Sequence, residues 1–299
     1  IQSRLTFNME SKKIYEIKKF FVNDNFEYRI KNDVAEFEGR PLDKNEFYTP
    51  EVRWEQIASY YGLDESAWRE KMLYLNNPES LPLELPLDFS WITSLDVKAR
   101  REGKISVNQF NPCFVNGVVR TKDNKVLIGI RSKKPTPENI QVFGAGLYDL
   151  PSTGYLTFKE KYQDNPFKDI VLEEFVDEVG NFNVVHNGII GVFESYQPGP
   201  QGLNFVSVLT TDASLGDIQA KHKEAMILYD EVTLKGASRS KAKQELADRN
   251  LPRDSVEHVS IDGIVDQDSE INATLEKQLH RFTGFGTGAL MTYILSSRF

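Results

Sequence analysis

A segment with clear start and stop signals for a helix constrains this chain more than any other. Asp164 and Asn165 offer capping side chains, and Pro166 follows them at a position suited to a first helical turn. Gly180 stands where a residue of left-handed backbone commonly ends a helix. We therefore predict a helix over residues 167–179.

The predicted helix has one apolar side and one acidic side. At about 100° per residue, the apolar side carries Val171, Leu172, Phe175, Val176 and Val179, and the acidic side carries Glu173, Glu174, Asp177 and Glu178. Acidic faces are usually only solvated. Here the crowded carboxylates repel one another and no interleaved lysine relieves the repulsion. A divalent cation would relieve it, and carboxylate oxygens suit Mg²⁺ or Mn²⁺.

The spacing of these carboxylates behind a glycine resembles the signature of the Nudix hydrolases. That signature reads glycine, five residues, glutamate, seven residues, then Arg-Glu-aliphatic-x-Glu-Glu-x-Gly. In this chain Gly154 is followed by five residues and then by Glu160. After twelve further residues comes the run Glu-Glu-Phe-Val-Asp-Glu-Val-Gly, which ends at Gly180. Three departures stand out: the five-residue insertion after Glu160, Asp177 in place of a glutamate, and Glu173 in place of the arginine that helps to orient the carboxylates.

The segments around the motif resemble the order in which the family builds its sheet. Residues 118–120 and 126–131 flank the turn at 122–125 and predict a strand hairpin. Two further strands are predicted at 188–193 and 204–210, and residues 225–229 are expected to form the last one. The resemblance implies an α+β fold: an α/β/α sandwich around a mixed sheet, with a smaller N-terminal α+β domain.

The resemblance also implies a metal site on the acidic side of the helix. It assigns Glu174, Asp177 and Glu178 as ligands of Mg²⁺, for which Mn²⁺ can substitute, and gives Glu174 and Glu178 a catalytic role. Glu160 and Glu224 compete for the role of base, Glu224 because it precedes the last predicted strand. Since metal coordination lowers the pKa of bound water, the base need not be strong.

The candidates for substrate binding lie outside the helix. Arg131 is the best candidate for gripping a phosphate, because a guanidinium pairs bidentately with that group. Gly154 is the candidate in the loop before the helix. Ser152 and Thr153, just before it, stand where further glycine is common in the family.

Hydrolysis of a diphosphate bond is the function that the resemblance implies. Such a bond repels nucleophilic oxygens, so its cleavage needs cations on the phosphate oxygens and an activated water. The run at 130–133, the insertion and the N-terminal extension resemble the branch that cleaves UDP-sugars to UMP and sugar 1-phosphate. ADP-ribose and dinucleotides are alternative substrates. Glu173 also leaves open a retired Nudix domain that binds a nucleotide or a protein.

Composition and length restrict the number of domains, the disulfide content and the class of partner that we expect. A chain of 299 residues, 40% hydrophobic and 27% charged, favours two domains, which we place at residues 1–95 and 96–299. The single cysteine, Cys113, excludes an intrachain disulfide and is expected to pack rather than react. The net charge of -8 argues against a nucleic-acid polymer as partner, which leaves a small-molecule nucleotide.

Neither a membrane span nor a signal-peptide core is visible in the sequence, because no apolar run reaches about 18 residues. We therefore expect a cytoplasmic protein without a membrane partner. The family often dimerises, so a homodimer is an open expectation. No pair of the four histidines has metal-ligand spacing, and His222, two residues before Glu224, is expected at the surface.

The remaining segments carry no motif that predicts chemistry. In the N-terminal part we predict strands at 14–22, 26–30 and 34–37, helices at 50–61 and 64–75, a proline-rich linker at 77–86 and a connecting segment at 91–103. Near the C-terminus, the glycine-rich run at 284–288 lacks the lysine of a phosphate-binding loop. It is expected to be a break before a closing helix at 289–296.

Overall fold

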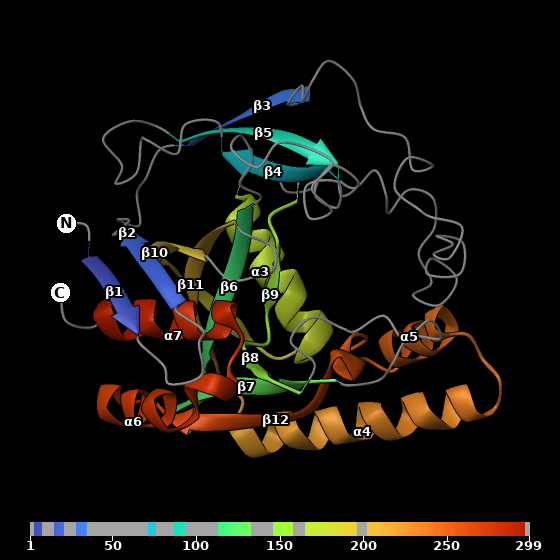
Figure 1. The fold of residues 1–299 in the computed structure, drawn as a ribbon. Helices are drawn as coiled ribbons and strands as arrows, with labels where there is room; N and C mark the ends of the chain where they lie inside the picture. Colours follow the sequence, from blue (N-terminus) through green and yellow to red (C-terminus); the bar gives the residue numbers. More distant parts are fainter. Residues whose placement is uncertain are drawn as a thin grey trace, which may run out of the picture.

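A large mixed sheet with helices on both faces forms the centre of the protein (Figure 1). The computed structural model describes residues 3–7, 15–20, 28–34, 71–75, 87–93, 113–132, 146–157, 165–195 and 202–296. Within them, no helix is both long enough and apolar enough to cross a bilayer.

The sheet joins strands from both ends of the chain. In spatial order its strands are β1 (Ser3–Phe7), β2 (Tyr15–Phe20), β10 (Val184–Ser195), β11 (Leu203–Thr211), β6 (Cys113–Arg120), β7 (Lys125–Arg131) and β12 (His258–Val265). Two short strands, β8 (Tyr148–Asp149) and β9 (Thr153–Tyr155), pair with β7 and β6. Strands β6 and β11 run parallel, and the other strand pairs of this sheet are antiparallel.

The helices cover the two faces of the sheet in separate groups. They are α3 (Pro166–Glu178), α4 (Leu215–Leu234), α5 (Arg239–Asp248), α6 (Asp268–Gln278) and α7 (Gly284–Ser296), with the short 3₁₀ turns η6 (Ser255–Glu257) and η7 (Leu279–Arg281). Helix α3 shares a core with one face of β6 and β11, whereas α6 and α7 share a core with the other face. The predicted α+β sandwich around a mixed sheet is therefore confirmed.

Helix α3 forms where its start and stop signals predict it. The side chain of Asn165 accepts a hydrogen bond of 3.0 Å from the backbone N–H of Lys168, and Gly180 has a φ of 124° beyond the last turn. The prediction of its faces was wrong at one position, since Val176 on the supposed apolar side is 39% exposed. On the acidic side, Glu178 is only 4% exposed. Other segments of the chain therefore cover the acidic side.

The predicted hairpin and the two strands after α3 are confirmed by β6, β7, β10 and β11. The predicted strand at 225–229 was wrong, because these residues lie in α4. Ser214 and Asp217 form a capping box at the start of α4, which favours a helix. The residues that α4 buries recur at helical spacing: Ile218, His222, Ala225, Leu228, Tyr229 and Val232. The last strand of the sheet is β12 instead.

The glycine-rich run at 284–288 is not a break, because it forms the first turns of α7. A Cβ atom on Gly288 would lie 2.3 Å from the ring of Phe193 in β10. The absence of a side chain at Gly288 thus lets α7 approach the sheet closely.

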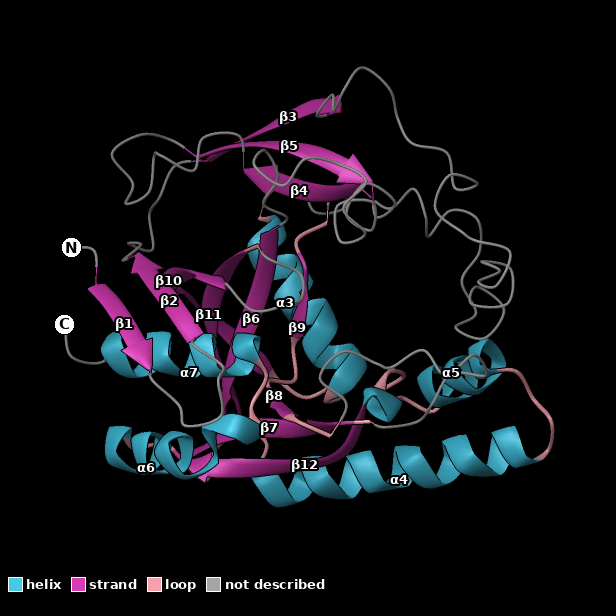
Figure 2. Ribbon diagram, viewed as in Figure 1, coloured by secondary structure: helices cyan, strands magenta, loops and turns pink. Residues whose placement is uncertain are grey.

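The N-terminal part contributes to both sheets of the structure. Strands β3 (Tyr28–Val34), β5 (Leu87–Thr93) and β4 (Lys71–Leu75) form a small second sheet (Figure 2). The helix predicted at 64–75 was wrong over the residues of β4, and the connecting segment predicted at 91–103 begins inside β5. Strand β2 confirms the strand at 14–22, and β3 overlaps the one at 26–30. The helix predicted at 50–61, the linker predicted at 77–86 and the part of the strand predicted at 34–37 beyond Val34 lie outside the described residues.

A strand pairing and contacts between aromatic rings join the N-terminal part to the large core. Strand β2 pairs with β10 in the large sheet, and the ring of Phe89 in β5 lies 5.8 Å from Phe167 and 6.2 Å from Phe205. The division into domains at residues 1–95 and 96–299 stays a prediction.

Candidate active site

The loop between β8 and β9 reaches the buried end of α3. The backbone N–H of Ser152 donates a hydrogen bond of 2.8 Å to Oε2 of Glu178, while the carbonyl of Ser152 accepts one of 3.0 Å from the N–H of Gly117 in β6. Ser152 has a φ of 76°, in the left-handed region that glycine adopts without cost. This is the position where the sequence resemblance leads one to expect glycine. The loop is thus fixed between the sheet and the acidic helix.

Gly154 makes room for a second carboxylate of α3. A Cβ atom at this position would lie 2.6 Å from Oε1 of Glu174. Any larger residue would therefore displace the Glu174 side chain. The predicted role of Gly154 in binding substrate stays a prediction, but its packing against Glu174 is a structural finding.

Burial and mutual repulsion raise the pKa of two carboxyl groups on α3. Burial, together with the charges of Glu257 and Asp177, raises the pKa of Glu174 to about 8. Burial also raises the pKa of Glu178 well above its ordinary value, with further contributions from Glu257 and Glu174. The Ser152 N–H and the Arg131 guanidinium act in the opposite direction on Glu178. Binding of a cation to this pair should therefore release protons to the solvent.

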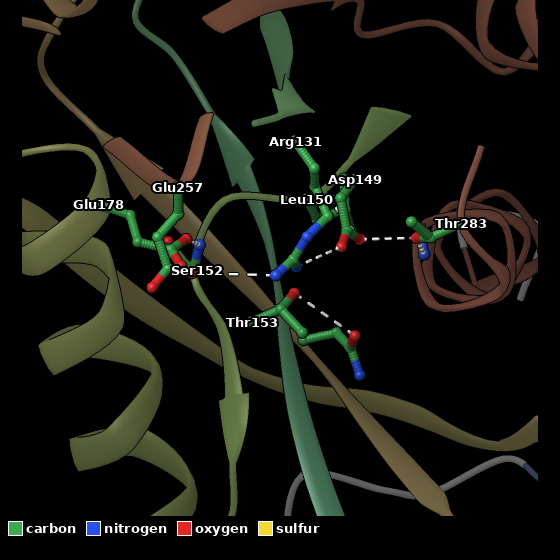
Figure 3. A network of polar contacts seen from close by, with 10 residues as sticks. Arg131, Asp149, Leu150, Ser152, Thr153, Glu178, Glu257 and Thr283 are labelled. Carbon is green, nitrogen blue, oxygen red and sulfur yellow. Dashed lines mark hydrogen bonds and ion pairs between the residues drawn. The ribbon is translucent and has the colours of Figure 1, made fainter. Parts of the chain in front are cut away.

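Glu257 is a carboxylate of this cluster that the sequence analysis missed. It ends η6 directly before β12, and Figure 3 shows it beside Glu178. The prediction of Glu224 as a candidate base rests on the strand predicted at 225–229, whereas the last strand of the sheet is β12. A signal was available in the β-branched residues of β12, which are Val259, Ile261, Ile264 and Val265.

Glu224 lies on the exposed side of α4. Its neighbour His222 is 4% exposed, so the expectation of a surface histidine was wrong. One ring nitrogen of His222 lies 3.1 Å from the carbonyl oxygen of Ser255 and 3.0 Å from that of His258. His222 thereby ties α4 to the segment that carries Glu257.

The residue after Glu257 fixes that segment on the sheet. His258 is 1% exposed, and a Cβ atom on Gly129 of β7 would lie 2.2 Å from its ring. Burial lowers the pKa of His258 to about 3, and the charge of Arg131 contributes to the decrease. The ring is therefore neutral at physiological pH, and next to Glu257 in the sequence it packs against Gly129 of β7.

Arg131 lies between two acidic groups of the site (Figure 3). Its Nη1 donates a hydrogen bond of 2.9 Å to Oδ2 of Asp149, and its Nη2 lies 3.9 Å from Oε2 of Glu257. Burial alone would lower the pKa of Arg131, but the charges of Asp149 and Glu257 outweigh it and raise this pKa. The hydroxyl of Thr283 donates a bond of 2.8 Å to Asp149 from the start of α7. Arg131 therefore orients carboxylates of the protein, and its contact with a phosphate stays a prediction.

Asp177 directly precedes Glu178 on α3 and pairs with an arginine from another segment. Nη2 of Arg253 donates a hydrogen bond of 2.5 Å to Oδ2 of Asp177. Burial raises the pKa of Asp177, and the charge of Arg253 opposes this effect. Arg253 is a second residue that the sequence analysis missed, because it lies in a loop far from α3 in the sequence.

The carboxylate oxygens of α3 are the kind of ligand that a hard divalent cation prefers, although they are not already arranged around a cation position. Among the described residues, no three His, Cys, Asp or Glu side chains form a group that could hold a metal ion as they stand. Glu174 and Glu178 nevertheless lie buried together with raised pKa values, as expected of acidic ligands without their cation. Glu160, the remaining carboxylate of the motif, lies outside the described residues.

Comparison with known proteins gives only distant likenesses. No protein-family model matches the chain, and no curated protein matches its sequence. Among solved structures, the chain resembles Tm1382, named as a candidate Nudix hydrolase, with 12% identity and a TM-score of 0.39 over 83% of this chain and 97% of that chain. It also resembles the MutT protein of Methanosarcina mazei Go1, with 14% identity and a TM-score of 0.36 over 64% of this chain and 97% of that chain.

A third similar structure is a bifunctional NMN adenylyltransferase/ADP ribose pyrophosphatase from Francisella tularensis. Identity is 15% and the TM-score is 0.36, and the match covers 67% of this chain and 44% of that protein. The chain thus matches less than half of the bifunctional protein. Because these TM-scores lie below 0.5, the likenesses carry no functional argument, and the function has to be inferred from the residues of this chain.

Proposed function

We propose that this chain is a Nudix-type diphosphatase that hydrolyses a nucleoside diphosphate joined to another group, with Mg²⁺ or Mn²⁺ as cofactor. The observation that carries the proposal is the buried pair of Glu174 and Glu178 under the charge of Glu257. Three neighbouring carboxylates, of which Glu178 is buried and the other two are half-buried, are costly for a folded protein unless a cation balances them. A module that only binds a nucleotide or a protein has no need of such a cluster.

The residues of the site divide the work of hydrolysis. Glu174, Asp177 and Glu178 would hold the cation, which supplies charge neutralisation on the phosphate oxygens and lowers the pKa of water. The Ser152 N–H fixes the Glu178 carboxylate in place, and burial keeps competing water away from it. Such fixed geometry lowers the cost of reaching the transition state.

The chemical step needs one proton acceptor. As the oxygen of water forms its bond to phosphorus, the bond from phosphorus to the bridging oxygen breaks, and the leaving phosphate keeps the electron pair. The proton of the water passes to a carboxylate. We assign this role to Glu257, which Arg131 holds beside Glu178, with Glu160 as the competing candidate.

The substrate that we propose is a UDP-sugar, cleaved to UMP and sugar 1-phosphate. The support is the sequence resemblance at 130–133, the insertion after Glu160 and the N-terminal extension. ADP-ribose and dinucleotides undergo the same bond cleavage and belong in the same assay.

The test is release of phosphate-containing products from UDP-glucose, UDP-galactose, ADP-ribose and a dinucleotide, with Mg²⁺ and with a chelator. Glu178→Gln is expected to lower kcat by about 100-fold or more, because loss of a metal ligand removes several kcal/mol of charge stabilisation. Glu276→Gln, on an exposed position of α6, is the matched control and should cleave as the wild type does. No cleavage of any compound, with nucleotide binding retained in calorimetry, would favour the retired binding domain.

A further inference from the structure

Helix α3 itself supplies no arginine to its acidic side. Lys168 in the first turn is the only basic residue of α3, and no basic residue occupies its last turn. Position 173, where the sequence resemblance leads one to expect an arginine, holds Glu173 instead. A guanidinium for this face therefore has to come from another segment.

The segment before η6 brings a guanidinium to α3. The backbone N–H of Asp254 donates a hydrogen bond of 2.7 Å to the carbonyl of Asp177, which is near the C-terminal end of the helix. The preceding residue, Arg253, donates its Nη2 to Oδ2 of the same aspartate. Lys243 of α5 forms an ion pair with Asp254 and so links this segment to α5. Three residues beyond Asp254, the same segment supplies Glu257.

This contact engages one of the two carboxylate oxygens of Asp177. The Asp177 side chain is 14% exposed, and its Oδ2 is occupied by Arg253 at 2.5 Å. The Arg253 side chain is 48% exposed, so Arg253 reaches Asp177 from the surface of the protein. A carboxylate held in this way has a fixed orientation, and partners that orient a metal ligand commonly contribute about ten- to hundredfold in metal affinity.

We propose that Arg253 is a positioning residue for the metal site: it orients Asp177 from outside the helix and takes over the task of the missing arginine at position 173. This inference rests on the proposed function, because it needs a cation at the carboxylates of α3. It also explains why a chain with Glu173 at that position keeps the rest of its acidic motif.

The experiment measures Mn²⁺ binding to the substrate-free protein from the electron paramagnetic resonance signal of free Mn²⁺. Arg253→Ala is expected to raise the Kd for Mn²⁺ about tenfold, by the usual contribution of such partners. Arg253→Lys keeps the charge but not the planar fork, so it should restore part of the affinity. Arg249→Ala removes the same charge from an exposed position and should bind Mn²⁺ as the wild type does.

A double-mutant cycle with Asp177→Asn separates positioning from loop anchoring. If Arg253 acts through Asp177, Arg253→Ala should add no further loss of Mn²⁺ affinity in the Asp177→Asn background. Additive losses, or an unchanged Kd in Arg253→Ala with its melting temperature near that of the wild type, would overturn the proposal. Wild-type protein that binds no Mn²⁺ would instead overturn the metal site itself, and the role of Arg253 with it.

Discussion

Ser152 and Glu178 are joined by a hydrogen bond of 2.8 Å from backbone N–H to carboxylate, although they lie 26 positions apart in the sequence. To make it, Ser152 holds a φ of 76°. Left-handed backbone at a residue other than glycine costs about 1–3 kcal/mol and is found where the surroundings enforce it. The site therefore keeps a strained residue in order to fix one carboxylate.

Ser152→Gly should relieve this strain without loss of the bond, since glycine keeps the backbone N–H. We expect the free energy of unfolding to rise by up to about 1 kcal/mol, because glycine adopts positive φ at no steric cost. Activity should stay within about twofold, since the donor to Glu178 is unchanged. Ser152→Ala is the control: it also removes the buried hydroxyl but keeps the Cβ atom, so its gain in a denaturant titration should be the smaller of the two. A gain of equal size in both variants would contradict the strain argument.

The raised pKa of Glu174 predicts how stability varies with pH. Its carboxyl ionises near 4.5 when unperturbed and near 8 in the folded chain. Folding thus favours the protonated form, so this contribution to stability is complete below about pH 4.5 and is lost as the pH rises to about 8. Melting temperatures measured in chelator should fall over this range, and Mg²⁺ or Mn²⁺ should restore more stability at the upper end.

Glu174→Gln should flatten this pH dependence, because the amide has no proton to lose. Its melting temperature in chelator should then exceed that of the wild type near pH 8. A wild-type melting temperature that stays level or rises across the range, with no added effect of metal, would refute the arrangement of buried carboxylates.

Gly154→Ala should impair the site through Glu174 alone. Its Cβ would lie 2.6 Å from Oε1 of Glu174, so the carboxylate must move by several tenths of an ångström or more. We expect kcat/KM to fall about tenfold or more, since catalytic groups lose rate steeply when displaced. Gly216→Ala in α4 is the control, because its Cβ would meet nothing closer than 3.8 Å; equal activity in the two variants would show that Glu174 tolerates displacement.

The kinetics of Glu257→Gln and Glu224→Gln should show which of the two glutamates acts as the base. Glu257→Gln removes the charge that acts most strongly on Glu174 and Glu178, so kcat should fall about 10²-fold, the usual scale for a general base. The pH at which activity rises should also shift downward, since the remaining carboxyls lose a like-charged neighbour. Glu224→Gln changes an exposed residue of α4 and should leave the pH–rate profile unchanged. The reverse result would reinstate Glu224.

The parts of the fold that depend on local signals could be predicted from the sequence. The start and end of α3 follow from Asn165, Pro166 and Gly180, which act within a few residues of themselves. The β6–β7 hairpin follows from alternating apolar residues around a polar turn. The run at 225–229 failed because a short apolar run fits a strand and a helix equally, and the capping box at Ser214 decided for a helix.

The parts of the site that come from distant segments could not be predicted in this way. Glu174 and Glu178 share one helix, so their spacing alone places them together. Glu257 and Arg253 reach the cluster only because α4, α5 and η6 share a small apolar core that holds their segment against α3. Its members are Ala225, Leu228, Tyr229, Val232, Ala242, Leu246, Leu251 and Val256.

The pairing of β2 with β10 has a consequence for any shortened form of the protein. Residues Val192–Ser195 of β10 lie opposite residues 17–20, so a chain reduced to 96–299 would lose its outermost strands and bare the hydrogen-bonding groups of β10. An uncovered strand edge recruits strands from other molecules. Such a fragment should therefore self-associate through β10, even though every residue assigned to the active site is still present in it.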